Sequence, residues 1–251
     1  MKTKIFTSCS LIIIIMAGFI SPLSAQLQID LESGAVFSGY NDVRIPNKTG
    51  TLISLKDDLS TDAAIFYRVK LQYTFSDKHT LGLLVAPLRL KAEGSVNKIV
   101  HFEGVDFPAN APLIANYRFD SYRLTYRYNF YRKPALKIGA GLTAKIRDAS
   151  IKFESGSLSS EKPNTGFVPL FHFMLDWRPS DWISLYLDAD ALASPQGQGR
   201  AEDVLAALRF RASEKFWFKI GYRLLEGGAD VDEVYNFTLL HYLLAGITYT
   251  L

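Results

Sequence analysis

Paired carboxylates are the residues of this sequence whose type and spacing come nearest to catalytic chemistry. Asp188 and Asp190 lie two residues apart in the segment 182–193, and an extended strand would put both side chains on one face. Two neighbouring carboxylates resist ionising together, so one keeps its proton to higher pH unless a cation lies between them. The spacing therefore predicts either a catalytic or cation-binding pair open to water, or an ion-pair network in which Arg147 or Arg200 partners the carboxylates.

Histidine is the residue that a hydrolytic site would need beside such carboxylates. His172 lies on the polar face of its segment, His241 lies on an apolar face, and His101 lies in an expected loop. We expect His172 to be a hydrogen-bond partner for a carboxylate such as Asp176 rather than a catalytic base. The acidic run at residues 230–233 lacks the spacing of a defined calcium loop, so no metal site is assigned.

The elements that must position these residues are strands, because the chain alternates with a period of two. Residues 65–75 carry apolar side chains at odd positions and, apart from Phe66, polar ones at even positions, and 122–130 and 136–147 also alternate with a period of two. Seven further segments complete the set, namely 28–45, 79–91, 167–178, 182–193, 203–211, 216–225 and 236–251. The pattern predicts about ten antiparallel strands, or eight if residues such as 203–211 form a loop.

The N-terminal segment has the order of a secretory signal peptide. Lys2 and Lys4 precede an apolar run at 11–20, and a proline and small residues follow up to Ala25. Cleavage there would leave a mature chain of residues 26–251 without cysteine, because the sole cysteine is Cys9. The mature chain would carry 26 basic and 25 acidic residues, without the basic patch that typifies nucleic-acid binding.

Three features favour a membrane barrel over a soluble β-sandwich. Short connections, as at 76–78 and 212–215, alternate with longer ones at 46–61, 94–112, 154–165, 195–202 and 227–235. Aromatic residues gather where strands meet the short connections, as an interfacial girdle would require. The chain also ends within a strand, with apolar side chains on one parity as far as Leu251.

On these features the chain resembles the small Gram-negative outer-membrane β-barrel proteins over residues 26–251, although that family usually ends in Phe. The resemblance implies an all-β, antiparallel up-and-down transmembrane barrel with short periplasmic turns and longer extracellular loops. It also implies a multi-pass protein of the cell outer membrane that contacts outer-membrane lipid and reaches the barrel-assembly machinery through its C-terminal strand. We expect a monomer.

Charged side chains follow the inward parity of the expected strands. Cations such as Arg68, Arg123 and Lys145 face acids such as Asp176 and Asp188, so in a narrow barrel they should pair and fill the lumen. Strand direction places a second group near the outer rim. The catalytic candidates there are Asp188, Asp190, Asp148, Asp203 and Glu202, and the binding candidates are Asn41, Asp42, Arg44, Arg147, Arg200, Arg223 and Glu226.

Three functions are compatible with this arrangement. The first is a non-enzymatic outer-membrane barrel with a structural or surface-binding role and no cofactor. The second is an outer-membrane hydrolase, omptin-like or lipid-modifying, that uses the rim carboxylates. Ten strands with paired aspartates resemble the omptin proteases, but these also need an Asp–His pair, and the expected rim carries no inward histidine. The third is a small-solute channel lined by charge.

Overall fold

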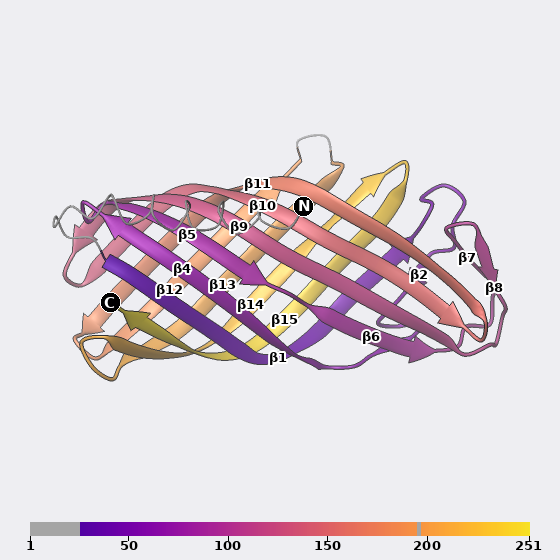
Figure 1. The fold of residues 1–251 in the computed structure, drawn as a ribbon, viewed down its shortest axis with the longest axis horizontal. Coiled ribbons are helices and arrows are strands. Elements are labelled where there is room, and N and C mark those ends of the chain that lie inside the picture. Colours follow the sequence, from indigo (N-terminus) through magenta and orange to yellow (C-terminus); the bar gives the residue numbers. More distant parts are fainter. Residues whose placement is uncertain (1–25, 195–196) are drawn as a thin grey trace, which may run out of the picture.

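Ten antiparallel strands close into a barrel in the computed structural model, which describes residues 26–194 and 197–251; the expected signal peptide, residues 1–25, lies outside these (Figure 1). The wall strands in ring order are β1 (Gln26–Arg44), β4 (Ala64–Phe75), β5 (His79–Ala86), β9 (Leu113–Lys133), β10 (Leu136–Ser155), β11 (Leu158–Ser180), β12 (Ile183–Ala193), β13 (Gly199–Arg211), β14 (Phe216–Val231) and β15 (Val234–Thr250).

The ring is closed by the pairing of the first and last strands. The β1–β15 ladder runs from Gln28↔Thr250 to Arg44↔Tyr235. The predicted all-β barrel is therefore confirmed. Ten strands is the correct count, because β13 pairs with β12 on one side and with β14 on the other instead of forming a loop. Among the described residues no helix is long and apolar enough to cross a membrane.

Short strands extend the wall at the end of the barrel that carries the longer connections. Pro87 interrupts the expected strand 79–91, and the chain continues as β6 (Arg89–Gly94), which still pairs with β9. β2 (Ile53–Ser54) pairs with β1, and β3 (Ser60–Thr61) pairs with β6. β7 (Val100–Phe102) and β8 (Val105–Phe107) form a separate hairpin. We call this end of the barrel the loop end, and the opposite end the turn end.

Two of the expected long loops are strands. β10 and β11 stay paired as far as Ser155↔Leu158, and β14 and β15 as far as Val231↔Val234, so 154–165 and 227–235 form hairpins that extend the wall. Gly156, with a φ of +58°, occupies the β10–β11 turn in the left-handed region where glycine is favoured. The residues of these hairpins are largely polar residues, glycine and proline, which is why their sequence resembles that of loops.

The outer face of the wall carries a belt of apolar side chains. Ile65 is 78% exposed, Phe171 65%, Leu142 60% and Leu243 57%, and each lies on the outward parity of its strand. Because exposed apolar side chains on this scale would be unfavourable in water, the belt marks the part of the wall that faces lipid.

The interior of the barrel has two different halves. Toward the turn end it is polar, with buried charged side chains from every part of the ring, among them Arg68, Arg123 and Asp203. Toward the loop end it is apolar, because residues 45–63 and 95–112 fold into the mouth and pack against the inner faces of the wall. We call these two segments the cap. Its fully buried side chains include Phe107, Ile53 and Leu55, which pack with Phe153 of β10.

The two segments of the cap hold each other in place. The Thr51 amide donates to the His101 carbonyl oxygen over 2.9 Å, and the Glu103 amide donates to the Ile45 carbonyl oxygen over 3.1 Å. The Phe102 and Phe153 rings meet edge to face with centroids 4.5 Å apart. The cap is thus a small apolar core that closes the loop end of the lumen.

Candidate functional site

A buried network of ion pairs spans the lumen below the cap, and Asp203 of β13 lies at its centre. Arg123 of β9 contacts the Asp203 carboxylate at 2.6 Å, Arg223 of β14 at 2.5 Å and Arg68 of β4 at 3.1 Å. Arg123 and Arg68 lie on strands that are not neighbours of β13, so these two pairs cross the barrel, whereas Arg223 lies on the adjacent strand β14. The luminal network comprises Asp30, Glu32, Asp188, Asp190 and Asp203 with Arg68, Lys70, Arg123, Lys219 and Arg223.

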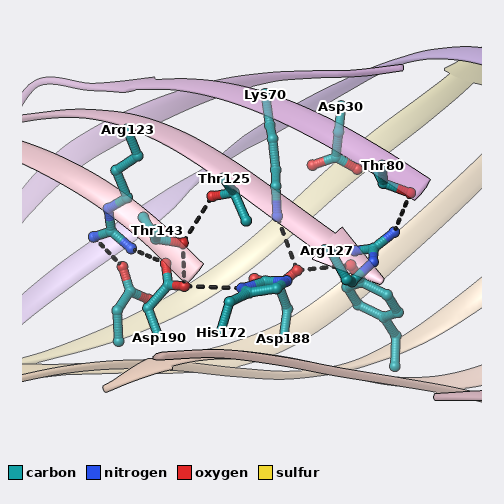
Figure 2. A network of polar contacts seen from close by, with 12 residues as sticks. Asp30, Lys70, Thr80, Arg123, Thr125, Arg127, Thr143, His172, Asp188 and Asp190 are labelled. Atoms are coloured by element: carbon teal, nitrogen blue, oxygen red, sulfur yellow. Dashed lines mark hydrogen bonds and ion pairs between the residues drawn. The ribbon is translucent and has the colours of Figure 1, made fainter. Parts of the chain in front are cut away.

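Asp190 has three partners, and Figure 2 shows them around its carboxylate. Arg123 donates to it over 2.7 Å, the Thr143 hydroxyl over 2.8 Å, and His172 Nδ1 lies 2.8 Å away. The expected partner of His172, Asp176, is instead held by Arg178 at 2.7 Å and by the Ser184 hydroxyl. The sequence could not identify the partner because the stagger between β11 and β12 decides which carboxylate faces the histidine.

Asp188 is also paired, and its partners differ from those of Asp190. Lys70 of β4 and the Tyr186 hydroxyl both donate to it over 2.8 Å. The prediction that Arg147 or Arg200 would pair with these aspartates is wrong, because Lys70 pairs with Asp188 and Arg123 pairs with Asp190. Both aspartates have less than a tenth of their surface exposed. An acidic pair that is saturated with cations and hydroxyls has the arrangement of a structural network.

The lumen is open at the turn end. A cavity of about 280 Å³ there is bordered by the network and by residues at the strand ends, such as Gln26, Asp77 and Arg132. Above it, the luminal network and then the cap occupy the barrel cross-section. We call this cavity the vestibule.

Asp203 joins Asp188 and Asp190 in the luminal network, but the other two acidic candidates, Asp148 and Glu202, do not. Asp148 continues the outward parity of Leu142 and Ile146 and pairs with Arg118 of β9 at 3.1 Å. Glu202 is exposed and shares the outward parity of Leu208. The expected convergence of these carboxylates on one rim site is therefore wrong, because alternation turns Asp148 and Glu202 away from the lumen.

The remaining binding candidates are divided among three places. Arg223 belongs to the luminal network, and Arg147 lies in a groove described below. On the outer face, Arg200 holds Glu226 at 2.7 and 2.8 Å, and Glu226 also accepts a hydrogen bond from the Tyr40 hydroxyl. Near them Arg44 binds Asn47 and lies 5.2 Å from the Tyr235 ring, the Asp42 carbonyl accepts from Asn236, and buried Asn41 accepts from Thr238.

Ion pairs also line the loop end outside the lipid-facing belt. Arg89 binds Asp120 with both terminal nitrogens, one of them at 2.8 Å. The hydrogen bond from Arg89 lowers the pKa of the Asp120 carboxyl from its ordinary value. Among the described residues there is no cluster of three or more His, Cys, Asp or Glu side chains that could hold a metal ion.

A lateral groove that the sequence does not predict interrupts the wall at the loop end. β12 and β13 end lower than their neighbours, so the groove lies above their hairpin and between the β10–β11 and β14–β15 hairpins. Its main cavity measures about 290 Å³. Its lining includes Tyr117, Phe119, Lys145, Arg147, Phe167 and Leu192. Alternation predicts that Lys145 faces inward, but the sequence gives no indication that the wall stops short beside it.

Comparison with known proteins identifies the fold. No model of a protein family matches the sequence, and no curated protein does. Among solved structures, the outer membrane protease OmpT from Escherichia coli superposes with a TM-score of 0.55 at 9% identity, over 90% of this chain and 97% of that one. That identity establishes a common fold and nothing about shared activity.

Two further structures agree less closely. An outer membrane channel from Pseudomonas putida F1 has a TM-score of 0.45 at 10% identity, over 92% of this chain and 97% of that one. The translocator domain of the autotransporter NalP from Neisseria meningitidis has a TM-score of 0.44 at 11% identity, over 97% of this chain and 94% of that one. With its closed ring of ten strands and apolar outer belt, the chain has the fold of the Gram-negative outer-membrane β-barrels.

Proposed function

We propose that this protein is an integral outer-membrane barrel that does not conduct solutes and acts at its outer face as a binding protein. In this proposal the signal peptide of residues 1–25 directs export, and the terminal strand β15 engages the assembly machinery. The turn end then faces the periplasm, so the cap and the lateral groove lie on the cell surface. The barrel would act as a monomer among outer-membrane lipids.

The observation that carries the proposal is the double closure of the lumen. A hydrated ion entering from the vestibule first meets the luminal network, whose carboxylates and cations are paired at 2.5–3.1 Å around Asp203. Beyond it lies the cap, where Phe107 and Phe153 are almost completely buried. Barrels with an aqueous channel generally have about 16 strands, whereas side chains can fill a barrel of about eight. Ten strands filled in this way favour a closed barrel over the small-solute channel.

The hydrolase alternative is less well supported by the same geometry. The Asp190–His172 pair is the nearest equivalent of the acid–base pair that an omptin-like enzyme requires. However, both side chains are buried, and Asp190 is already bound by Arg123 and Thr143. A general base needs access to the proton that it abstracts, directly or through one water. Asp190 borders the vestibule at the turn end, but His172 does not, and the cap lies between this pair and the loop end.

Conductance across planar lipid bilayers tests the proposal. The purified barrel should insert without producing stable single-channel steps, while a water-filled porin added to the same bilayer confirms that steps would be detected. Insertion is measured independently, by protection of the barrel from protease after reconstitution into vesicles. Large, stable steps from the inserted wild-type protein would contradict the proposal and favour the channel.

A further inference from the structure

The lateral groove exists because neighbouring hairpins have unequal lengths. β11 pairs with β12 only as far as Phe171↔Ala191, but it pairs with β10 as far as Leu158↔Ser155. Residues 158–170 of β11 therefore lack a partner strand on the β12 side among the described residues. On the far side, β13 and β14 remain paired as far as Gly199↔Ala229. The result is a gap in the described part of the wall, with the ends of β12 and β13 as its lower edge.

The groove reaches from this gap into the barrel. Its main cavity of about 290 Å³ adjoins a second of about 150 Å³, and both are lined by Tyr117, Phe119 and Arg147. Aromatic and aliphatic side chains, including Phe167 and Leu192, form much of the surface. The main cavity lies near the lower end of the size range for small-molecule sites, about 300–1,000 Å³. Its shape and lining suit a slender apolar molecule.

Two cations face this apolar surface without a carboxylate partner. Lys145 is 4% exposed, and its ammonium lies 4.9 Å from the centre of the Phe119 ring. Within residues 26–194 and 197–251 it has neither a hydrogen-bond acceptor nor an ion-pair partner. Arg147 donates to Asn164, and its buried Nε has no partner. A buried charge without a partner is costly, so these two side chains differ sharply from the paired cations of the luminal network.

The carboxylate closest to serving these cations is already occupied. Glu226 also lines the groove, but it is bound by Arg200 at 2.7 Å and by the Tyr40 hydroxyl. Neither Lys145 nor Arg147 thus has a carboxylate partner in this largely apolar cavity. An anion would complete the site by pairing with both side chains.

The position of the groove indicates where its ligand comes from. Phe167, at the mouth of the groove, is 64% exposed on the outer face. Phe171, four residues further along the same face of β11, is 65% exposed within the apolar belt. The mouth therefore lies where the lipid-facing belt ends. A molecule in the outer surface of the membrane could place its hydrocarbon part in the groove without crossing water.

We propose that the lateral groove binds an anionic single-chain amphiphile, whose acidic head group pairs with Lys145 and Arg147 and whose chain packs against Phe119, Phe167 and Leu192. This inference rests on the proposed binding role and gives that role a ligand class. A carboxylate from a free fatty acid and a phosphate from a single-chain lipid share the required chemistry.

Calorimetric titration of the full barrel in nanodiscs of zwitterionic lipid tests the inference. The probes are dodecanoate and dodecyl phosphate, with dodecanol and dodecyltrimethylammonium as uncharged and cationic counterparts of the same chain length. We expect saturable binding of one or both anions at one site, and which anion binds more tightly identifies the source of the ligand. Failure of both anions to bind, or equal binding of dodecanol or the cationic probe, would overturn the inference.

Variants distinguish the groove from non-specific partition into the barrel surface. Lys145→Met should weaken anion binding by about tenfold or more, because a charged hydrogen bond is lost. Lys152→Met removes a cation of the same strand whose partner is Glu154, and it should leave binding unchanged. Ala229→Trp fills the cavity without changing its charge and should abolish binding. Equal binding by wild type and Ala229→Trp, with the fold intact by circular dichroism, would refute the site.

These readouts separate the two proposals. Conductance of the inserted wild-type barrel tests closure alone and does not depend on the groove. If the barrel proves closed but binds no anionic amphiphile, only the ligand inference fails. If it binds the anion but conducts, the ligand inference is supported and the proposal of a closed barrel is contradicted.

Discussion

The luminal network and the cap are two interiors of one barrel, and they are built from opposite kinds of side chain. The network, at the depth of the apolar belt, is made of charged residues such as Asp203 and Arg123. The cap, beyond the belt, is made of side chains such as Phe107 and Ile53. Polar groups are thus buried where the barrel is surrounded by lipid, and apolar groups where it is surrounded by water.

The surrounding solvent explains this inversion. Within the belt the outer face of each strand is apolar because it meets hydrocarbon, and the alternation leaves the inner face to polar side chains that must satisfy one another. Beyond the belt both faces of the wall would meet water. Only there can the interior gain stability by removing apolar surface from water, as a soluble domain does. The cap therefore behaves as a small soluble core on a membrane barrel.

The largest expected effect comes from breaking the network on one side only. Asp203→Ala leaves Arg68, Arg123 and Arg223 without their shared carboxylate, and removal of one partner from a buried ion pair costs about 3–5 kcal/mol. Asp148→Ala removes the partly exposed partner of Arg118 at the rim and should cost about 0–1 kcal/mol. Urea unfolding in lipid vesicles measures both. Equal costs would mean that the network does not stabilise the barrel.

A somewhat smaller effect is expected from placing charge on the wrong face of the wall. Leu142 is 60% exposed in the belt, and Leu142→Arg should cost about 2–4 kcal/mol near the bilayer midplane. Gln28→Arg places the same side chain in the vestibule and should be tolerated. Folding yield into vesicles and unfolding midpoints report the difference. If Gln28→Arg were the more harmful change, the assignment of inner and outer faces would be reversed.

The smallest expected effect comes from shortening two isoleucines of β10, one buried from water and one exposed to lipid. Ile151 is buried against the cap, and Ile151→Val should cost about 0.5–1.5 kcal/mol, as in a soluble core. Ile146 is 43% exposed in the belt, where lipid fills the space that the missing methyl leaves, so Ile146→Val should cost less. Protease resistance of the cap and the unfolding free energy would show this. A larger cost at Ile146 would contradict a water-driven core in the cap.

The sequence predicted the wall better than it predicted the sites. Alternation of residues such as Ile65, Tyr67 and Val69 revealed the membrane-spanning part of each strand, because lipid on one side imposes a period of two. The same signal ends where the lipid ends, so the β10–β11 extension was expected to be a loop. The cap did leave a signal, in apolar residues such as Ile53 and Phe107 within expected loops.

The partners within the candidate site depend on geometry that the sequence does not contain. Asp190 was correctly expected to face inward, but pairing with Arg123 instead of Arg147 follows from the tilt and stagger of strands across the ring. The groove follows from the relative heights of hairpins. Alternation gives each side chain a face, and only the closed ring gives it neighbours.

The most direct test of the account is whether the network and the cap close the lumen independently. Gly94 and Leu113 are register partners, so residues 95–112 can be replaced by a two-residue turn that removes half of the cap and leaves the ring intact. Arg123→Ser combined with Asp203→Ser opens the network without changing net charge. In planar bilayers, wild type and each change alone should remain without stable steps, and the two changes together should conduct. Stable conductance steps from the wild type, or no conductance from the folded combined variant, would contradict the claim that the network and the cap each close the lumen.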